Sequence, residues 1–480
     1  MKKLLILFLG PALCLLLTLS PYELLSAEAD AVLGIAIWMI LWWITEVVAI
    51  PVTALIPLTF FPLLGIMDMQ QVTSHYGHPI VFLFFGGFVM ALTLEKVKLH
   101  KRIALHIIRY TGNSPDRIIL GFMIATAFLS MWISNTATTV VMLPIAYSVI
   151  QLLIDDADGF TKNDQNFSLS IMLGIAYAAN VGGIATLIGT PPNIVFAGFM
   201  ESEYNYSVSF IDWMLVGIPF AVIMLGMIYL TLTKIMYPNR LGNFEQSAAL
   251  LQREIQQLGP MKKAEKYVLV IFITAVIAWI SKNTINQLFP ALHLSDTSIS
   301  MVAAMSCFVV LYKKNPLLAW DDTTRLPWGI VILFGGGLAL AKGLSNAGLI
   351  DVIGNLVSQW SSTSSLLIAA LLISLVLFMT ELMSNVALIA IFAPTVVGIT
   401  LGLEMNTLQV LIPVTMASSC AFMLPMSTPP NAIVFASGHI KIPQMMRAGI
   451  VLNCIAILLL VLFYSYIIPL VFELLPLTEV

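Results

Sequence analysis

Long apolar segments follow one another along almost the whole chain, and clusters of polar residues interrupt several of them. Many of these segments have about 17 to 25 residues, the length that a helix needs to cross a lipid bilayer. The short segments of alternating polarity that are typical of transmembrane β-barrels do not occur. The pattern predicts an all-α polytopic membrane protein with about 11 transmembrane helices and two re-entrant hairpins.

The first half of the chain is predicted to run from 31 to 236. The preceding segment, 1–30, has two lysines and an apolar run, which fits either a transmembrane helix at 4–20 or a secretory signal peptide. We expect helices at 31–49, 51–67, 79–97 and 213–236, an amphipathic surface helix at 98–110, a hairpin at 117–153 and a broken helix at 169–199. The hairpin is predicted because the polar cluster Ile133–Thr139 splits its apolar run near the middle.

The second half repeats this order of elements. After a hydrophilic linker at 237–266, which is predicted to be cytoplasmic, residues 267–480 are expected to form helices at 267–289, 296–313 and 328–345, a mixed segment at 346–361, a hairpin at 364–402, a broken helix at 407–438 and a last helix at 447–472. Three landmarks recur in the same order: Phe-Gly-Gly at Phe85 and Phe334, Ser-Asn at Ser134 and Ser384, and Thr-Pro-Pro-Asn at Thr190 and Thr428. Such internal duplication is typical of secondary transporters.

Composition and charge agree with this architecture. Of the 480 residues, 59% are hydrophobic and 10% are charged, whereas soluble domains have roughly 25% charged residues. With the N-terminus in the cytoplasm, the predicted loops place all of the 22 Lys and Arg residues except Lys282 and Lys342 on the cytoplasmic side. The two halves are then inverted relative to each other, as alternating access at a midplane site requires. No basic tract suggests binding of nucleic acid.

The two Ser-Asn clusters are the first candidates for a binding site. Asn amides and Ser or Thr hydroxyls both donate and accept hydrogen bonds, so they can hold a carboxylate or a sodium ion. A hairpin turn also leaves free carbonyl groups at one helix end and free N–H groups at the next. The alternative is that these hydroxyls bond back to their own helix or join helices together. The repetition of the Ser-Asn pair favours a binding site.

The two Thr-Pro-Pro-Asn segments are the more specific signal. Proline lacks an N–H group and stops a helix, so Pro-Pro inside an apolar run predicts a break. We expect Thr190 and Thr428 to cap the helices that follow. Gly189 would let the backbone approach an ion closely, and Ser427 takes the equivalent place in the second half.

Together these segments resemble the divalent anion/sodium symporters, specifically the INDY-type dicarboxylate carriers of bacteria, over essentially the whole chain. The resemblance rests on Ser134–Thr138, Gly189–Asn193, Phe334–Gly337 and Ser427–Asn431. It implies that each hairpin turn and the helix break facing it form one sodium site, with the substrate between the Ser-Asn motifs. By motif position, the implied sodium ligands are Ser130, Ser134, Asn135 and Gly189 in the first site and Thr380, Met383, Asn385 and Ser427 in the second. The implied substrate contacts are Asn135, Thr136, Thr190, Asn385, Thr428 and Pro429.

Val386 departs from the family pattern, which has Thr at this place. The substrate-binding position at Val386 therefore lacks one hydroxyl donor. A hydrogen bond to a charged group contributes about 1.5–3 kcal/mol, which is enough to change the ranking of dicarboxylate, tricarboxylate and sulfate.

The predicted function is sodium-coupled import of C4 dicarboxylates such as succinate, malate or fumarate, with two or more sodium ions. The resemblance also implies an elevator-type motion, a homodimer and a location in the bacterial inner membrane. Alternatives are a sulfate or tricarboxylate carrier, a dicarboxylate exchanger, or proton coupling through Glu46 or Glu381, whose other interpretation is structural bonding to a helix end. An enzyme is not predicted, because neither a nucleophile with its base nor an HExxH spacing is found.

Overall fold

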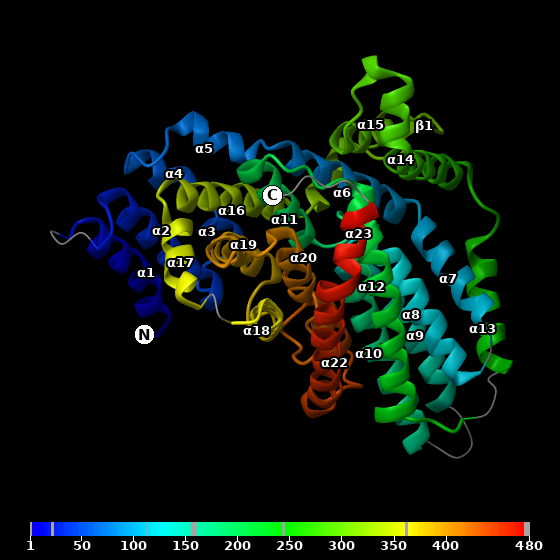
Figure 1. Ribbon diagram of the computed structural model, residues 1–480. Helices are drawn as coiled ribbons and strands as arrows, with labels where there is room; N and C mark the ends of the chain where they lie inside the picture. Colours follow the sequence, from blue (N-terminus) through cyan, green and yellow to red (C-terminus); the bar gives the residue numbers. More distant parts are fainter. Residues whose placement is uncertain are drawn as a thin grey trace.

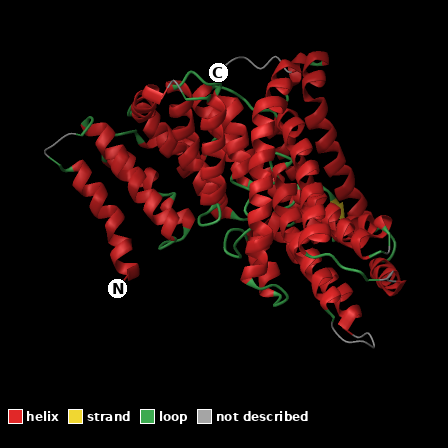
Figure 2. Ribbon diagram, turned by 60° about the horizontal axis from the view of Figure 1, so that its bottom comes forward, coloured by secondary structure: helices red, strands yellow, loops and turns green. Residues whose placement is uncertain are grey.

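The computed structural model of the chain describes residues 2–20, 24–112, 114–154, 161–241, 245–360 and 363–474. Almost all of this is helical (Figure 2), apart from loops and one antiparallel pair of short strands, β1 (Leu311–Tyr312) and β2 (Asn315–Pro316). Within the described ranges, eight helices are long and apolar enough to span a membrane, and shorter apolar helices accompany them. The predicted all-α polytopic fold is therefore confirmed, while the number of membrane crossings stays a prediction.

The helices of the first half lie in the predicted order (Figure 1). They are α1 (Lys2–Thr18), α2 (Ala27–Thr45), α3 (Ile50–Thr53), α4 (Ile56–Leu63), α5 (Met69–Tyr76), α6 (Pro79–Lys96), α7 (Leu99–Thr111), α8 (Pro115–Ser130), α9 (Asn135–Ile154), α10 (Lys162–Ile184), α11 (Pro191–Tyr204) and α12 (Phe210–Leu230). Helix α12 continues into a π-helical turn, Thr231–Met236.

The helices of the second half repeat this order after a helical linker. They are α13 (Glu245–Leu258), α14 (Lys263–Leu288), α15 (Asp296–Val309), α16 (Trp328–Asn346), α17 (Leu349–Val357), α18 (Ser365–Met379), α19 (Asn385–Gly402), α20 (Thr407–Ala417), α21 (Pro429–Ala436), α22 (Ile442–Leu462) and α23 (Ile468–Leu474). Three 3-10 turns lie at Pro290–Leu292, Trp320–Arg325 and Ser358–Trp360. The last long helix, α22, again passes into a π-helical turn, Phe463–Ile467, as α12 does.

Small residues allow the N-terminal helices α1 and α2 to approach each other closely. A Cβ on Gly10 would lie 2.6 Å from the Trp38 ring, and a Cβ on Gly34 would lie 3.0 Å from the Cα of Cys14. The indole of Trp42 donates a hydrogen bond to the Leu7 carbonyl. Close packing through glycine is typical of helices within a membrane, which agrees with the transmembrane interpretation of 4–20.

The hydrophilic linker contains a helix that the sequence pattern did not predict. Helix α13 packs against the amphipathic helix α7. Lys101 of α7 pairs with Glu254 at 2.9 Å. The neighbouring Arg102 pairs with the buried Glu265 at 2.5 Å and also donates to the carbonyl groups of Leu258 and Gly259. The linker is thus fixed to the surface of the first half.

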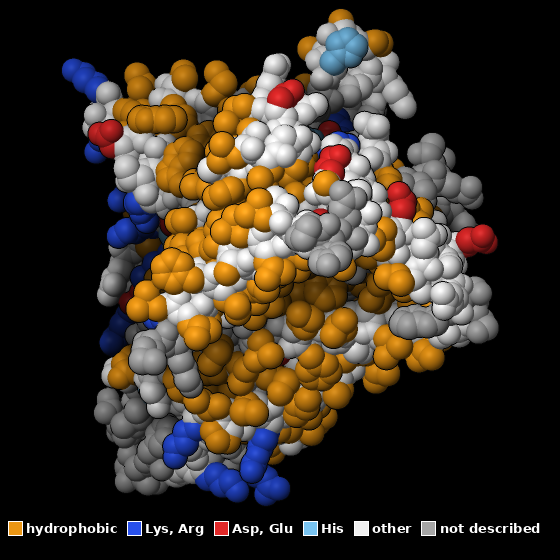
Figure 3. Space-filling model, turned by 90° about the vertical axis from the view of Figure 1, so that its left-hand side faces the viewer, with side chains coloured by type: hydrophobic (Ala, Val, Ile, Leu, Met, Phe, Trp, Pro, Cys, Tyr) orange, Lys and Arg blue, Asp and Glu red, His pale blue; other side chains and the backbone are white. Residues whose placement is uncertain are grey.

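The outer surface resembles that of a protein surrounded by lipid. Figure 3 shows a face on which hydrophobic side chains cover most of the middle, with Lys and Arg side chains gathered toward its edges. Large apolar side chains such as Leu15, Val222, Val270 and Leu371 are exposed in the isolated chain. Continuous apolar surfaces of this kind are unfavourable in water and favourable in a bilayer.

Candidate functional site

The turn of the first hairpin brings Ser130 and Asn135 together. Helix α8 ends at Ser130 and α9 begins at Asn135, so the two residues flank the turn. The Ser130 hydroxyl oxygen lies 2.5 Å from Asn135 Oδ1 and 2.7 Å from the carbonyl oxygen of Ala179 on α10. Ser130 itself is fully buried. Three oxygens from three helices therefore meet in one cluster, which we call the first oxygen cluster.

The first oxygen cluster contains more acceptors than hydrogens. A hydroxyl group has one hydrogen to donate, whereas an amide oxygen and a backbone carbonyl oxygen can only accept. The Ser130 hydroxyl can therefore satisfy only one of its two oxygen neighbours, and the other pair faces each other without a hydrogen between them. A cation near these oxygens removes that repulsion, because all three carry negative partial charge.

The second hairpin forms the same cluster from different residues. Helix α18 ends at Met379 and α19 begins at Asn385. The hydroxyl oxygen of the fully buried Thr380 lies 2.6 Å from Asn385 Oδ1 and 2.5 Å from the Ser418 carbonyl oxygen. This second oxygen cluster has the same excess of acceptors. The structure thus extends the predicted duplication from sequence to atomic contacts.

The first helix break lies directly against the first oxygen cluster. A Cβ on Gly183, at the end of α10, would lie 2.6 Å from Asn135 Oδ1, and a Cβ on Gly189 would overlap the Gly183 backbone. Glycine is therefore required at both positions by close approach of backbone groups. The two hydrogens of the Asn193 amide are shared among the carbonyl groups of Gly183, Ile184 and Thr186, which fixes the shape of the break.

The second helix break is longer and is held in a similar way. Helix α20 ends at Ala417 and α21 begins at Pro429. The two hydrogens of the Asn431 amide are shared among the carbonyl groups of Ala421 and Leu424 and the Ser427 hydroxyl, each 3.1 Å from Nδ2. The last residue of each Thr-Pro-Pro-Asn segment therefore fixes its own helix break. This role of Asn193 and Asn431 was not predicted from the sequence, although the repeated motif contains both residues.

The two halves meet at these breaks. Helix α21 packs against α9 and α10, and α11 packs against α19 and α20, so each short helix after a break reaches the other half. A side-chain hydrogen bond between Asn180 and Thr428 crosses directly from the first half to the second. The helix break of each half is therefore in contact with the other half, and a single site that combines both halves stays a prediction.

Several predicted site residues lie outside the two oxygen clusters. The Ser134 hydroxyl accepts a hydrogen bond from the Ala137 N–H and so caps α9, while Thr136 is exposed. Met383 and Val386 are buried next to Asn385, and Pro429 is exposed at the start of α21. Thr428 caps α21 by accepting from the Asn431 N–H, as expected.

The expected capping role of Thr190 is wrong. Its side chain makes no capping hydrogen bond to α11, although the backbone has the extended conformation of an N-cap residue. The Asn193 N–H instead bonds to the Thr190 carbonyl oxygen. The buried Thr190 hydroxyl is thus not committed to its own helix.

The two carboxylates that could serve proton coupling, Glu46 and Glu381, differ in burial and in their hydrogen-bond partners. Glu46 lies at the exposed end of α2 with a left-handed backbone. Glu381 is buried, and its Oε1 accepts hydrogen bonds from the N–H groups of Phe422 and Met423 and from the Asn453 amide. Its Oε2 accepts from the Leu424 N–H. This arrangement supports the structural interpretation of Glu381 as a group bonded to a helix break.

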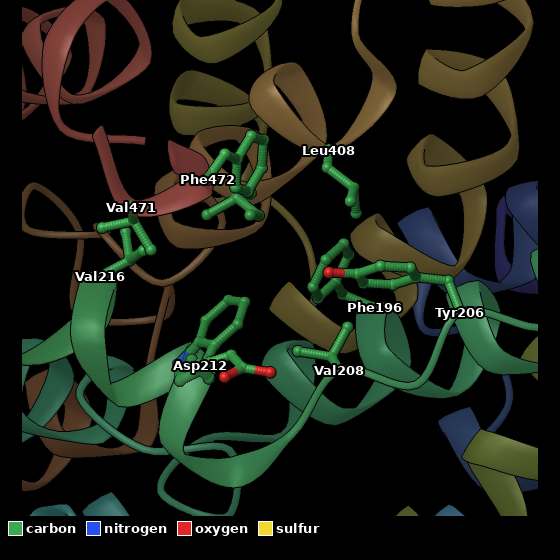
Figure 4. Close-up of a pocket in the computed structure, with 10 residues that line it drawn as sticks. Phe196, Tyr206, Val208, Asp212, Val216, Leu408, Val471 and Phe472 are labelled. Atoms are coloured by element: carbon green, nitrogen blue, oxygen red, sulfur yellow. The ribbon is translucent and has the colours of Figure 1, made fainter. Parts of the chain in front are cut away.

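Neutral oxygens, and not a cluster of ionisable ligands, characterise the candidate site. In the part of the chain that the structure describes, no three His, Cys, Asp or Glu side chains come together in a way that could hold a metal ion. A separate pocket lies between α11, α12, α20 and α23 and contains none of the predicted site residues (Figure 4). Its walls are mainly apolar, with Phe196, Trp213 and Phe472 among them, so it does not suit a small dianion.

Comparison with known proteins gives consistent matches. The model of one protein family, described as the sodium:sulfate symporter transmembrane region, matches residues 1–473. A sodium-dependent dicarboxylate transporter of Staphylococcus saprophyticus is 37% identical over 471 residues, covering 96% of this chain and 91% of the relative. The transporter of the same name from Staphylococcus aureus strain USA300 is 38% identical over 474 residues, covering 97% of this chain and 91% of the relative.

Solved structures of two transporters share the fold. The YdaH transporter of Alcanivorax borkumensis superimposes with a TM-score of 0.56 at 12% identity, covering 98% of this chain and 97% of that one. MtrF of Neisseria gonorrhoeae, described as one of a class of antimetabolite efflux pumps, gives a TM-score of 0.57 at 11% identity, covering 95% and 96%. At this level of identity the likeness concerns the fold alone.

Proposed function

Since the chain belongs to the sodium:sulfate symporter family, we propose that it imports a C4 dicarboxylate such as succinate, malate or fumarate together with sodium ions. It is a multi-pass membrane transporter and not an enzyme. The names of its staphylococcal relatives, which cover almost the whole chain, support both the substrate class and the dependence on sodium.

The observation that carries the proposal is the pair of oxygen clusters. Ser130 and Thr380 each touch two oxygens that only accept, at 2.5 to 2.7 Å, while having one hydrogen to donate. Sodium-coupled transporters bind their ion with carbonyl and hydroxyl oxygens at such discontinuities of helices. We place one sodium ion at each cluster, with the backbones of Gly189 and Ser427 and the turn residues Ser134 and Met383 completing the two sites.

The substrate is placed between the two sodium sites. The Asn135 and Asn385 amides and the hydroxyl groups of Thr136, Thr190 and Thr428 supply donors for its carboxylates, with Val386 and Pro429 at the boundary of the site. The starts of α9 and α19, where the first N–H groups have no acceptor within the helix, also favour an anion. Two or more sodium ions would balance the double negative charge, which is costly to hold alone in a medium of low dielectric constant.

We propose that alternating access arises from the two inverted repeats, 31–236 and 267–480. The hairpins and broken helices, α8–α11 and α18–α21, would move as an elevator against a scaffold of the remaining helices, and the scaffold would form a homodimer. The location proposed is the bacterial cell membrane with the linker in the cytoplasm. The predicted loop charges support this orientation, and both lysines predicted to lie outside are paired, Lys282 with Asp296 and Lys342 with Glu203.

Competition for uptake tests the substrate class. Purified protein in liposomes, supplied with labelled succinate at fixed external sodium, is expected to be inhibited by excess unlabelled malate or fumarate. Sulfate or citrate at the same concentration is expected to inhibit weakly. Strong inhibition by sulfate without inhibition by malate would show that the substrate class is wrong and would favour the sulfate carrier.

Replacement of Val386 by Thr tests the selectivity of the site. The new hydroxyl adds one donor beside Asn385, and a hydrogen bond to a charged group contributes about 1.5–3 kcal/mol. We expect the KM ratio of citrate to succinate to change by roughly tenfold or more in Val386→Thr. The same substitution at Val396, ten positions further along the buried face of α19, serves as the control. An identical ratio in both variants and in the parent would remove Val386 from the substrate site.

A further inference from the structure

Asn180 lies on α10 immediately after a residue of the first oxygen cluster. The carbonyl group of Ala179, which contacts the Ser130 hydroxyl at 2.7 Å, belongs to the same peptide unit as the Asn180 N–H. A peptide unit is planar and rigid, so a displacement of the whole unit toward a bound cation also moves the Cα of Asn180. The Asn180 side chain is 1% exposed and therefore has no access to bulk water.

The Asn180 side chain reaches across to the second helix break. Its Nδ2 donates to Thr428 Oγ1 at 3.1 Å and to the Ala421 carbonyl oxygen at 3.2 Å. Asn431 binds the same two groups, through its N–H to Thr428 Oγ1 and through its Nδ2 to the Ala421 carbonyl. Asn431 also holds the hydroxyl of Ser427, which belongs to the second sodium site as proposed above. Asn180 thus joins the group of contacts that fixes the second break.

Among the residues that the structure describes, no matching side-chain link runs in the opposite direction. Ser418 and Ser419 follow α20 in the position that corresponds to Asn180. The Ser418 hydroxyl donates to the Thr415 carbonyl of its own helix, and the Ser419 hydroxyl has no hydrogen-bond partner among the described residues. The side-chain connection between the oxygen cluster of one half and the helix break of the other therefore depends on Asn180, which neither the repeated motifs nor the sodium-ligand assignment contains.

We infer that Asn180 is a positioning residue that couples the two sodium sites, so that occupation of one site shapes the other. The inference rests on the proposed sodium symport. A cation at the first oxygen cluster draws in the Ala179 carbonyl, and the buried hydrogen bonds of Asn180 pass that shift to Ala421 and Thr428. Coupling of binding sites is reciprocal, so a cation at the second site favours binding at the first by the same factor. The measurable consequence is positive cooperativity for sodium.

The sodium dependence of succinate uptake by Asn180→Ala tests this coupling. Initial rates are measured in proteoliposomes over a range of sodium concentrations, with choline keeping the ionic strength constant. The parent is expected to give a strongly sigmoidal curve, and Asn180→Ala a less sigmoidal curve, like that of two independent sites that must both be filled, with half-saturation at roughly five- to tenfold higher sodium. The maximal rate at saturating sodium is expected to stay within about threefold, since Asn180 is not itself a ligand. Ser168→Ala is the matched control, because this buried hydroxyl lies on the same helix and has no hydrogen-bond partner among the described residues.

The possible outcomes separate coupling from a purely structural role. A lower maximal rate with unchanged sigmoidicity and half-saturation would mean that Asn180 only supports the fold. A parent curve no steeper than that of two independent sites would mean that there is no coupling to explain. Either result overturns the inference. Uptake by the parent without any sodium dependence would instead refute the proposed symport itself. If Asn180→Ala does not fold, Asn180→Ser tests the coupling in its place. The shorter serine side chain has one hydrogen to donate and cannot bond to both the Ala421 carbonyl and Thr428 Oγ1. The sodium dependence of uptake by Asn180→Ser must then be less sigmoidal than that of the parent, and a curve identical to the parent's would overturn the inference.

Discussion

Replacement of either Asn135 or Asn385 by Ala is expected to lower sodium-driven succinate uptake by about 100-fold or more. Each amide oxygen belongs to an oxygen cluster, and each amide is also proposed to donate to the substrate. Losing two contacts to charged groups removes roughly 3–6 kcal/mol at about 1.5–3 kcal/mol each. Initial rates of labelled succinate uptake into proteoliposomes, normalised to the amount of inserted protein, measure the effect.

The fold should tolerate both substitutions, which makes the result interpretable. Asn135 and Asn385 are the first residues of α9 and α19, and alanine is favourable within a helix. Asn355→Ala, on the exposed side of α17, is a control that should transport like the parent. Uptake above about a third of the parent rate in either site variant would be incompatible with the contact losses estimated above.

Glu381→Ala is expected to prevent accumulation of folded protein. The substitution leaves the N–H groups of Phe422, Met423 and Leu424 and the Asn453 amide without the acceptor that now holds them. Each buried donor without a partner costs about 1–3 kcal/mol, so the total approaches the whole free energy of unfolding of a typical domain, about 5–15 kcal/mol. Size-exclusion chromatography in detergent, with a thermal unfolding curve, measures the loss.

Glu381→Gln separates the hydrogen bonds from the charge. With its amide oxygen in the place of Oε1, glutamine keeps three of the four hydrogen bonds and loses only the one to Leu424. We therefore expect this variant to fold, with a lower melting temperature than the parent. If Glu381→Ala instead formed a monodisperse protein with the parent's melting temperature and uptake, the role assigned to Glu381 would be wrong.

The features that follow from local chemistry could be predicted from the sequence. Both hairpin turns and both helix breaks lie where the polar clusters and the Pro-Pro pairs place them, because a helix cannot continue through those residues. The family resemblance placed Ser130 with Asn135 in one sodium site and Thr380 with Asn385 in the other, and the members of each pair are in contact. These contacts lie within one hairpin, so sequence proximity is sufficient to anticipate them.

The features that depend on packing between distant segments could not be predicted. Helix α13 has the polar composition of a linker and is held by Lys101 and Arg102, more than 150 residues earlier in the chain. The expected cap at Thr190 is absent because Asn193 holds the break through three carbonyl groups instead. Glu381 was ambiguous in sequence, since only the position of the 422–424 backbone shows which groups surround the carboxylate.

The central claim is that an inward sodium gradient drives dicarboxylate uptake through this site. Its most direct test measures labelled succinate inside proteoliposomes that have sodium outside, potassium at the same concentration inside, and no other gradient that favours the anion. The proposed function predicts that internal succinate rises above the external concentration and falls back when a sodium ionophore collapses the gradient. Internal succinate that never exceeds the external concentration, or accumulation that the ionophore leaves unchanged, would contradict it.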